Sequence, residues 1–158
     1  MPPGAADIIL VEDNAHDAEL ALYALSKRNF AQNVVVLRDG AEALEYLFCT
    51  GAFSTRRPDD LPRLVLLDLK LPKVDGTEVL QRMKADRRLR GTPVVMLTSS
   101  REERDITECY RLGANSYVVK PVDFDLFARA LQAIGSYWLE LNERVPSAGA
   151  AFPAEGPR

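Results

Sequence analysis

The sequence is poor in the features that mark secreted, membrane-spanning or nucleic-acid-binding proteins. Its 158 residues include only two cysteines, Cys49 and Cys109, which are too few for a disulfide framework and favour a reducing compartment. No apolar run approaches the ~20 residues that a transmembrane helix needs, and the first residues lack the basic and apolar regions of a signal peptide. The net charge of −3 gives no general reason to expect nucleic acid or an acidic membrane as a partner. We therefore expect a cytoplasmic protein that binds neither.

Signals for β-hairpins are also missing, because no Asn-Gly pair joins two apolar runs. Five short apolar runs instead alternate with segments of helical periodicity, which favours βαβ units. We expect an α/β fold of one domain, with a doubly wound, five-stranded parallel sheet and helices on both faces. The predicted strands are residues 7–12, 33–37, 64–68, 94–98 and 116–119.

Turn and cap residues place the helices between these strands. Asp39 and Asp75 are expected to cap the second and third helices, and Ser100 with Glu103 predicts a capping box for the fourth. The last helix is expected to run from about residue 123 to residue 142. Residues 1–6 and 145–158 are rich in Pro, Gly and Ala, so we expect a flexible N-terminus and a disordered C-terminal tail around one domain at residues 7–144.

Polar residues stand where four of the five strands end, namely Glu12 and Asp13, Asp68, Thr98 and Lys120. Each is by itself compatible with an ordinary turn, but the carboxyl ends of parallel strands share one edge, which is where open α/β sheets bind ligands. Three carboxylates at that edge would repel one another. Lys120 can neutralise one charge, and a hard divalent cation such as Mg²⁺ suits the remaining oxygen ligands. Asp68 would then be a nucleophile for a phosphoryl group, giving an acyl phosphate.

With these residues at the strand ends, the sequence resembles the receiver domain of two-component response regulators, a CheY-like family. The matching residues are the acidic pair Glu12-Asp13, Asp68 in the string LLDLKLP with Asp75-Gly76 after it, Thr98, and Lys120-Pro121. The resemblance covers residues 7–142. It implies the flavodoxin-like strand order 2-1-3-4-5, which is described for the chemotaxis member of this family.

The resemblance also implies the function and the site. Asp68 would accept a phosphoryl group from a sensor histidine kinase in a phosphorelay, with Thr98 and Lys120 as the other catalytic residues. Mg²⁺ would be bound by Asp13, Asp68 and the backbone carbonyl of Lys70, and by Glu12 through a water molecule. The chain would not be an enzyme with a separate substrate, but a phosphoprotein that catalyses its own Mg²⁺-dependent phosphotransfer and autodephosphorylation, and signals through protein contacts.

The same resemblance implies conformational features. The bond between Lys120 and Pro121 would be cis, an uncommon conformation that usually occurs in tight turns. Phosphorylation would draw the Thr98 hydroxyl toward Asp68 and let Tyr117 turn inward, which makes these two the switch residues. The weakly apolar helix at residues 101–112 would be the element that moves.

The last helix predicts self-association. Its apolar stripe is longer than a sheet of short strands can cover, which would leave its last turns exposed. We expect a homodimer through this helix and the fifth strand; the alternative is that the C-terminal tail folds back over the stripe. The interface residues would be Phe127, Ile134, Trp138 and Leu141.

A narrower resemblance and three alternatives complete the interpretation. The long basic loop before residue 64 and the extended last helix resemble the small response regulators of phytochrome signalling. A haloacid dehalogenase phosphatase also uses an Asp nucleophile and Mg²⁺, but Asp68-Leu69-Lys70 lacks its second acid. A flavin-binding domain of the same topology would need a Gly-rich phosphate cradle, which the acidic loop at residues 12–14 does not provide. A phosphorylation-silent interaction module is disfavoured by the intact site.

Overall fold

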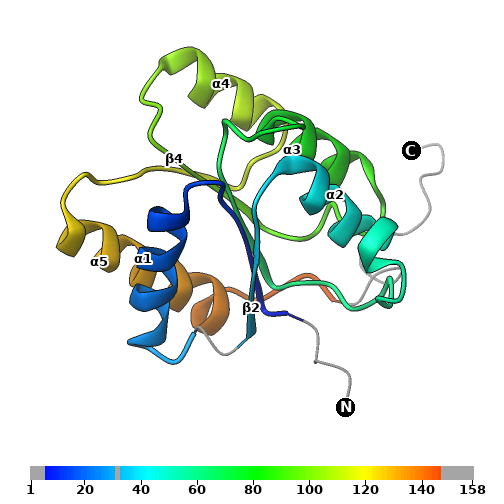
Figure 1. Cartoon of the computed structure of the whole chain (residues 1–158), viewed down its shortest axis with the longest axis horizontal. Coiled ribbons are helices and arrows are strands. Elements are labelled where there is room, and N and C mark those ends of the chain that lie inside the picture. Colours follow the sequence, from blue (N-terminus) through cyan, green and yellow to red (C-terminus); the bar gives the residue numbers. More distant parts are fainter. Residues whose placement is uncertain (1–5, 31–32, 147–158) are drawn as a thin grey trace.

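The protein forms an α/β fold around one parallel sheet (Figure 1). The computed structural model describes residues 6–30 and 33–146, so the expectations for residues 1–5 and 147–158 fall outside the described residues. All strand pairs are parallel, and the strand order is β2-β1-β3-β4-β5, as predicted. The strands are β1 (Ile8–Val11), β2 (Val34–Leu37), β3 (Leu64–Leu67), β4 (Val94–Thr98) and β5 (Ser116–Val119).

The sheet is central because its middle strands are apolar at every position. All four residues of β1 and of β3 are buried, and the two strands pair in register from Ile8 with Leu64 to Val11 with Leu67. A strand covered on both faces has no solvent side, which is why no polar alternation interrupts these runs. Truncating one of the fully buried leucines here, such as Leu66→Ala, would cost about 2–5 kcal/mol of stability.

Helices cover both faces of the sheet and create two apolar clusters. The first core lies under α2, α3 and α4, and the second core lies under α1 and α5. Figure 1 shows α1 and α5 side by side, apart from α2 and α3. Among the described residues no helix is long and apolar enough to cross a membrane. The helices are α1 (Ala15–Ser26), α2 (Gly40–Phe48), α3 (Gly76–Ala85), α4 (Glu103–Arg111) and α5 (Phe124–Gly135), with a 3₁₀ turn η2 (Gly51–Phe53) after α2.

Side-chain caps begin most of these helices, with one departure from the sequence prediction. Asp39 and Asp75 cap α2 and α3 as expected, each accepting a hydrogen bond from a backbone N–H of its helix. The capping box predicted for α4 is wrong, because the N-cap residue is Glu102 rather than Ser100. Ser100 lies two residues before this N-cap, and its hydroxyl donates to the Asp105 carboxylate at 2.5 Å, a hydrogen bond that ties the loop between β4 and α4 to the helix.

The last helix is not one continuous α-helix as predicted. After α5 the chain widens into a π-helix, η3 (Ser136–Leu141), closed by a hydrogen bond from the Asn142 N–H to the Tyr137 carbonyl at 2.7 Å. The change begins at Gly135, where a Cβ would lie 2.6 Å from the Phe30 ring. The ring therefore packs directly on the backbone, and the wider turn brings Trp138 against the second core.

Candidate functional site

The strand ends bring the predicted polar residues to one edge of the sheet. Glu12 and Asp13 follow β1, Asp68 follows β3, and Lys120 follows β5. The backbone continues the sheet as far as the site, because the Asp68 N–H donates to the Val11 carbonyl at 3.1 Å. The strands therefore fix the separation of these side chains, as a parallel sheet requires.

Lys120 is the centre of the polar cluster. Its ammonium pairs with a Glu12 carboxylate oxygen, lies 3.0 Å from Asp17 Oδ2, and lies 3.4 Å from Asp68 Oδ2. The side chains of Lys120 and Glu12 are 8% and 3% exposed, so the pair is screened little by water. Burial alone would lower the pKa of Lys120, but the hydrogen bond with Glu12 and the charge of Asp68 outweigh it and raise the pKa. Lys120 is therefore held as a cation.

The carboxylates exceed the cations at this edge. Burial, together with the charge of Asp68, raises the pKa of Glu12 to about 7, although Lys120 opposes the shift. Carboxylate oxygens of Glu12, Asp13 and Asp68 all lie within 4.8 Å of one another. An all-oxygen set of this charge and spacing is what hard divalent cations take as ligands. Glu12 is already committed to Lys120 and to the Asn14 N–H, so Asp13, which is exposed, is the freest of the three ligands.

A cleft opens from Asp68 toward the loop between β4 and α4. Its lining includes Asp68, Lys70 and Thr98. The Asp68 carboxylate is oriented by the backbone, because its Oδ1 accepts a hydrogen bond from the Leu69 N–H at 2.7 Å. The Thr98 hydroxyl is buried and accepts a hydrogen bond from the Ser100 N–H at 3.3 Å. One carboxylate, one ammonium and one hydroxyl thus border a space that is open to solvent.

Tyr117 lies behind this cleft. It is half-buried against the first core, and its hydroxyl donates to the Ser100 carbonyl at 3.0 Å. Because Ser100 also bonds Thr98 and Asp105, one loop residue links β5, β4 and α4.

Two site residues carry a role that sequence reasoning did not assign. Asp17 reaches Lys120 from the first turn of α1, and the only sequence signal for this is its position four residues after Asp13. Gly76 begins α3 directly against the site, where a Cβ would lie 2.1 Å from the Asp68 carbonyl oxygen. The Asp75-Gly76 pair belongs to the family resemblance, but only the packing explains why residue 76 must be glycine.

Comparison with known proteins agrees with this geometry. The family model described as the response regulator receiver domain matches residues 8–132, which is most of the chain. The chain belongs to the response regulator receiver family. This membership decides against the haloacid dehalogenase and flavin-binding alternatives. It also agrees with the observed sheet, in which five parallel strands have the order 2-1-3-4-5.

The relatives of this receiver domain include response regulators of phytochrome systems. Response regulator Rcp1 of Synechocystis is 38% identical to this chain over 133 residues, which are 84% of this chain and 88% of Rcp1. The structure of the Mn²⁺-bound form of Rcp1 superposes with a TM-score of 0.80 at 36% identity, over 87% of this chain and 96% of that one. The phosphorylated cyanobacterial phytochrome response regulator RcpA is 39% identical, with a TM-score of 0.81 over 87% of this chain and 96% of that one. The bacteriophytochrome response regulator AtBRR is 57% identical, with a TM-score of 0.69 over 89% of this chain and all of that one.

One expectation taken from the receiver family is wrong in this structure. No peptide bond among the described residues is cis, so the bond between Lys120 and Pro121 is trans. The trans form is the intrinsically preferred one for an X-Pro bond, by about 0.5–1 kcal/mol. The Lys120 side chain reaches Glu12 with this bond trans.

The interface predicted on the last helix of this receiver domain is only partly available. Phe127 and Ile134 are 3% and 9% exposed and belong to the second core, so they were wrongly assigned to an interface. Trp138 packs partly against the same core, while Leu141 is 72% exposed. A stripe at 3–4 spacing faces the sheet by necessity, so only the end of the helix, beyond the cover of the strands, leaves its stripe open.

Proposed function

We propose that this receiver domain is a phosphoacceptor switch, in which Asp68 receives a phosphoryl group from a sensor histidine kinase. The observation that carries the proposal is the position of Asp68: its carboxylate lies in an open cleft, 3.4 Å from the Lys120 ammonium and beside the carboxylates of Glu12 and Asp13. An Asp68 oxygen attacks phosphorus, the bond from phosphorus to the kinase histidine nitrogen breaks, and that nitrogen takes the electron pair. The product is an acyl phosphate on Asp68.

We assign the divalent cation as Mg²⁺, held by Asp13, Asp68 and the Lys70 carbonyl, with Glu12 acting through water. The clustered oxygens support this set, and Mg²⁺ keeps several waters and takes one or two carboxylates. When bound, the ion neutralises charge on the phosphoryl oxygens. Lys120 and the Thr98 hydroxyl stabilise the same oxygens, and Lys120 needs no proton transfer because it is held as a cation. The same groups support autodephosphorylation, in which a water oxygen attacks phosphorus, the bond from phosphorus to the Asp68 oxygen breaks, and the Asp68 oxygen takes the electron pair as inorganic phosphate leaves.

The kinase would contact the face beside Lys120. Val122 is fully exposed and Phe124 is 42% exposed, and both line a cleft that also includes His16, Ser99 and Lys120. Large apolar side chains grouped beside a reactive group are typical of a protein-binding surface. A kinase helix docked on α1 and the loop before α5 would place its histidine near Asp68.

The phytochrome pathway is the input that the relatives favour. RcpA and AtBRR are described as phytochrome and bacteriophytochrome response regulators, and they cover nearly the whole of this chain. We propose a phytochrome-type histidine kinase as the cognate kinase and the cytoplasm as the compartment. Output would pass through protein contacts.

Self-association is the remaining part of the proposal. Tyr137 and Leu141 at the end of the last helix are 49% and 72% exposed, and Trp138 completes the patch through a T-shaped contact with the Tyr137 ring. We propose a homodimer in which this patch and β5 of each protomer meet across a two-fold axis. Phe127 and Ile134 then support the patch from the core rather than touching the partner.

Phosphotransfer from a purified phosphorylated histidine kinase tests the proposed function. Wild-type protein should acquire a label that requires Mg²⁺ and is released by hydroxylamine, as an acyl phosphate is. Asp68→Asn keeps the size of the side chain but removes the nucleophile, so labelling should be lost. Asp59→Asn, at an exposed loop position, is the matched control and should label normally. Labelling of Asp68→Asn at the wild-type rate would exclude Asp68 as the acceptor.

A further inference from the structure

Asp17 brings a further carboxylate to the phosphoacceptor site, and it comes from a helix rather than from the end of a strand. Its Oδ2 lies 3.0 Å from the Lys120 ammonium, although the two residues are 103 positions apart in the sequence. Helix capping does not account for this carboxylate. An acid at the third position of a helix often accepts from the N-cap N–H, but the Asn14 N–H donates to Glu12 instead, at 3.1 Å. The Asp17 side chain is therefore directed to Lys120.

The Lys120 ammonium has three carboxylates as neighbours, one for each of its N–H donors, and they contribute unequally. Asp17 lies at 3.0 Å, Glu12 is closer, and Asp68 is the most distant at 3.4 Å. Hydrogen bonds between an ammonium and a carboxylate usually measure about 2.7–2.9 Å. The Lys120 side chain is only 8% exposed, so water competes little for these donors. The ammonium is thus drawn toward Glu12 and Asp17 and away from the Asp68 oxygen.

Asp17 contacts Lys120 from outside the cleft that holds the acceptor. Asp68 and Thr98 line the cleft that opens toward the loop between β4 and α4. Asp17 and Lys120 line a neighbouring cleft, and Ser99 borders both. Asp17 can therefore hold the ammonium without occupying the space that an incoming phosphoryl group needs.

The distance between Lys120 and Asp68 affects the reactivity of the acceptor. A carboxylate oxygen that accepts a short hydrogen bond from an ammonium has a lone pair engaged, and it is a weaker nucleophile than a free one. At 3.4 Å the ammonium leaves the Asp68 oxygen available for attack. It is still near enough to stabilise the oxygens of a phosphoryl group that arrives at Asp68.

From these contacts we propose that Asp17 is a positioning residue that holds the Lys120 ammonium back from the Asp68 carboxylate. The acceptor oxygen then stays free to attack phosphorus, and the ammonium stays free for the phosphoryl oxygens. Without Asp17, one donor of Lys120 would turn to Asp68 and shorten that contact. The inference rests on the proposed phosphoacceptor function and adds to it a residue that acts only through Lys120.

Phosphorylation of the full chain by phosphoramidate tests the proposal without the kinase, because the P–N bond of this small donor breaks as that of a phosphohistidine does. At saturating Mg²⁺, followed by the mass of the intact chain, Asp17→Ala should react about three- to tenfold more slowly than wild type, the range for one lost hydrogen bond. Asp17→Asn keeps an acceptor oxygen and should stay within about twofold of wild type. Glu19→Ala removes an exposed acid from the same helix and is the matched control, which should react as wild type does.

NMR of the Lys120 side chain gives a readout that a general loss of stability would not produce. The Nζ signal of Lys120 is identified by its absence from Lys120→Met. In the unphosphorylated, metal-free protein, Asp17→Ala should shift this signal and speed the exchange of the ammonium protons with water, because one of the three acceptors is gone. The backbone amide signals of β1 and β3 should not move, and Glu19→Ala should leave the Lys120 signal unchanged.

Three results would overturn the proposal. They are a wild-type rate in Asp17→Ala, an equal loss of rate in Asp17→Asn and Asp17→Ala, and a Lys120 signal that does not respond to Asp17→Ala. A wild type that takes up no phosphoryl group at Asp68 would instead remove the phosphoacceptor function on which the inference rests. The Lys120 signal would then still show whether Asp17 places the ammonium, so the two failures are distinguishable.

Discussion

Lys120 and Glu12, which are 108 residues apart in the sequence, form a buried ion pair at the ends of β5 and β1. The pair joins strands that are not neighbours in the sheet, since β3 and β4 lie between them. Removing one member of a buried pair leaves an uncompensated charge and costs about 3–5 kcal/mol, whereas removing both members costs much less. The pair therefore makes stability depend on the same lysine that the proposed chemistry uses.

The first prediction follows from this pair. Lys120→Met should lower the free energy of unfolding by about 3–5 kcal/mol, because Glu12 and Asp68 lose their nearest cation. The double variant Glu12→Gln, Lys120→Met should recover much of the loss. Urea unfolding in EDTA measures both, with Lys70→Met, an exposed lysine in the same cleft, as the control. Equal stability of Lys120→Met and wild type would contradict the ion pair.

A second prediction separates the two acids that follow β1. Asp13→Ala should weaken Mg²⁺ binding more than Glu12→Ala, because the Glu12 oxygens are used by Lys120 and by the Asn14 N–H while Asp13 is exposed. Calorimetric titration with Mg²⁺ gives the affinities directly. If wild type and both variants bind with the same affinity, the proposed ligand set is wrong.

The third prediction concerns the proposed switch. Beryllofluoride, a phosphoryl mimic, should draw the Thr98 hydroxyl away from the Ser100 N–H and disturb the bond from Tyr117 to the Ser100 carbonyl. The Tyr117 rotamer should change, and residues 101–112 should become protected from hydrogen exchange, with α2 as the internal control. An unchanged rotamer together with unchanged exchange would argue against Ser100 as the coupling point.

The fourth prediction uses the lowered pKa of Lys84, about 8 in the folded protein. Between about pH 8 and the ordinary lysine pKa near 10.4, the unfolded chain binds more protons than the folded one. The free energy of unfolding of wild type should therefore rise with pH across this window, relative to Lys84→Met, which has no such group. Urea unfolding at intervals from pH 7 to pH 10 measures the difference, and a flat or falling difference would contradict the lowered pKa of the half-buried Lys84 ammonium.

The fifth prediction tests the dimer. Leu141→Glu places a charge in the exposed patch at the end of the last helix and should lower the sedimentation coefficient at tens of micromolar, a concentration at which we expect wild type to associate. Thr55→Glu, at an exposed loop position, is the control. A wild type that remains monomeric with and without beryllofluoride would rule out the interface.

The pattern of the amino-acid sequence was enough to predict a five-stranded parallel sheet and the residues of the candidate site, whereas the strand order followed from the resemblance to the receiver family. Apolar runs such as residues 64–67 are short and uninterrupted, so only a strand covered on both faces buries them, and alternation with helices requires parallel crossovers. Because the strands are parallel, the residues that directly follow each strand lie at the same edge of the sheet. The positions of Glu12, Asp68 and Lys120 thus follow from local pattern alone.

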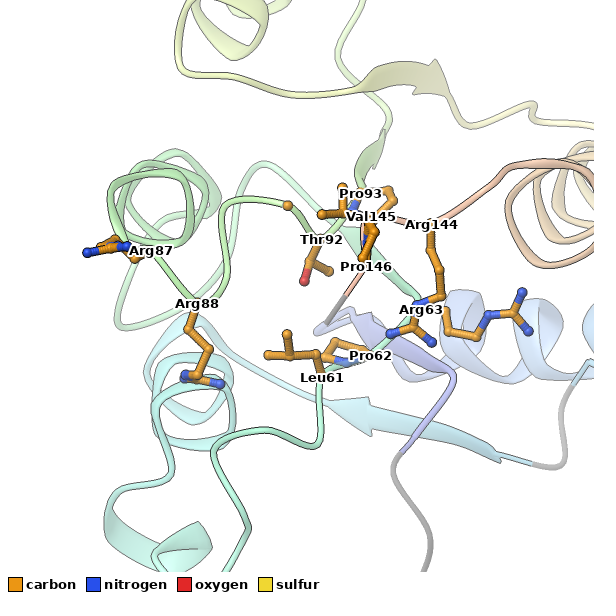
Figure 2. A pocket seen from close by; sticks show the side chains of 11 residues that line it. Leu61, Pro62, Arg63, Arg87, Arg88, Thr92, Pro93, Arg144, Val145 and Pro146 are labelled. Atoms are coloured by element: carbon orange, nitrogen blue, oxygen red, sulfur yellow. The ribbon is translucent and has the colours of Figure 1, made fainter. Parts of the chain in front are cut away.

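Other features of the site and of the last helix depend on contacts between elements that are far apart in the sequence. Asp17 reaches Lys120 only because α1 packs where its first turn overhangs the site. Phe127 and Trp138 lie on the same apolar stripe, yet one is core and the other partly open, because the Phe30 ring against Gly135 and the π-turn set where the helix leaves the sheet. One pocket is lined by residues from three separate segments, 61–63, 87–93 and 144–146, which only the folded chain brings together (Figure 2). Periodicity shows which face of a helix is apolar, but whether that face is buried depends on how far the neighbouring helices and strands extend along it.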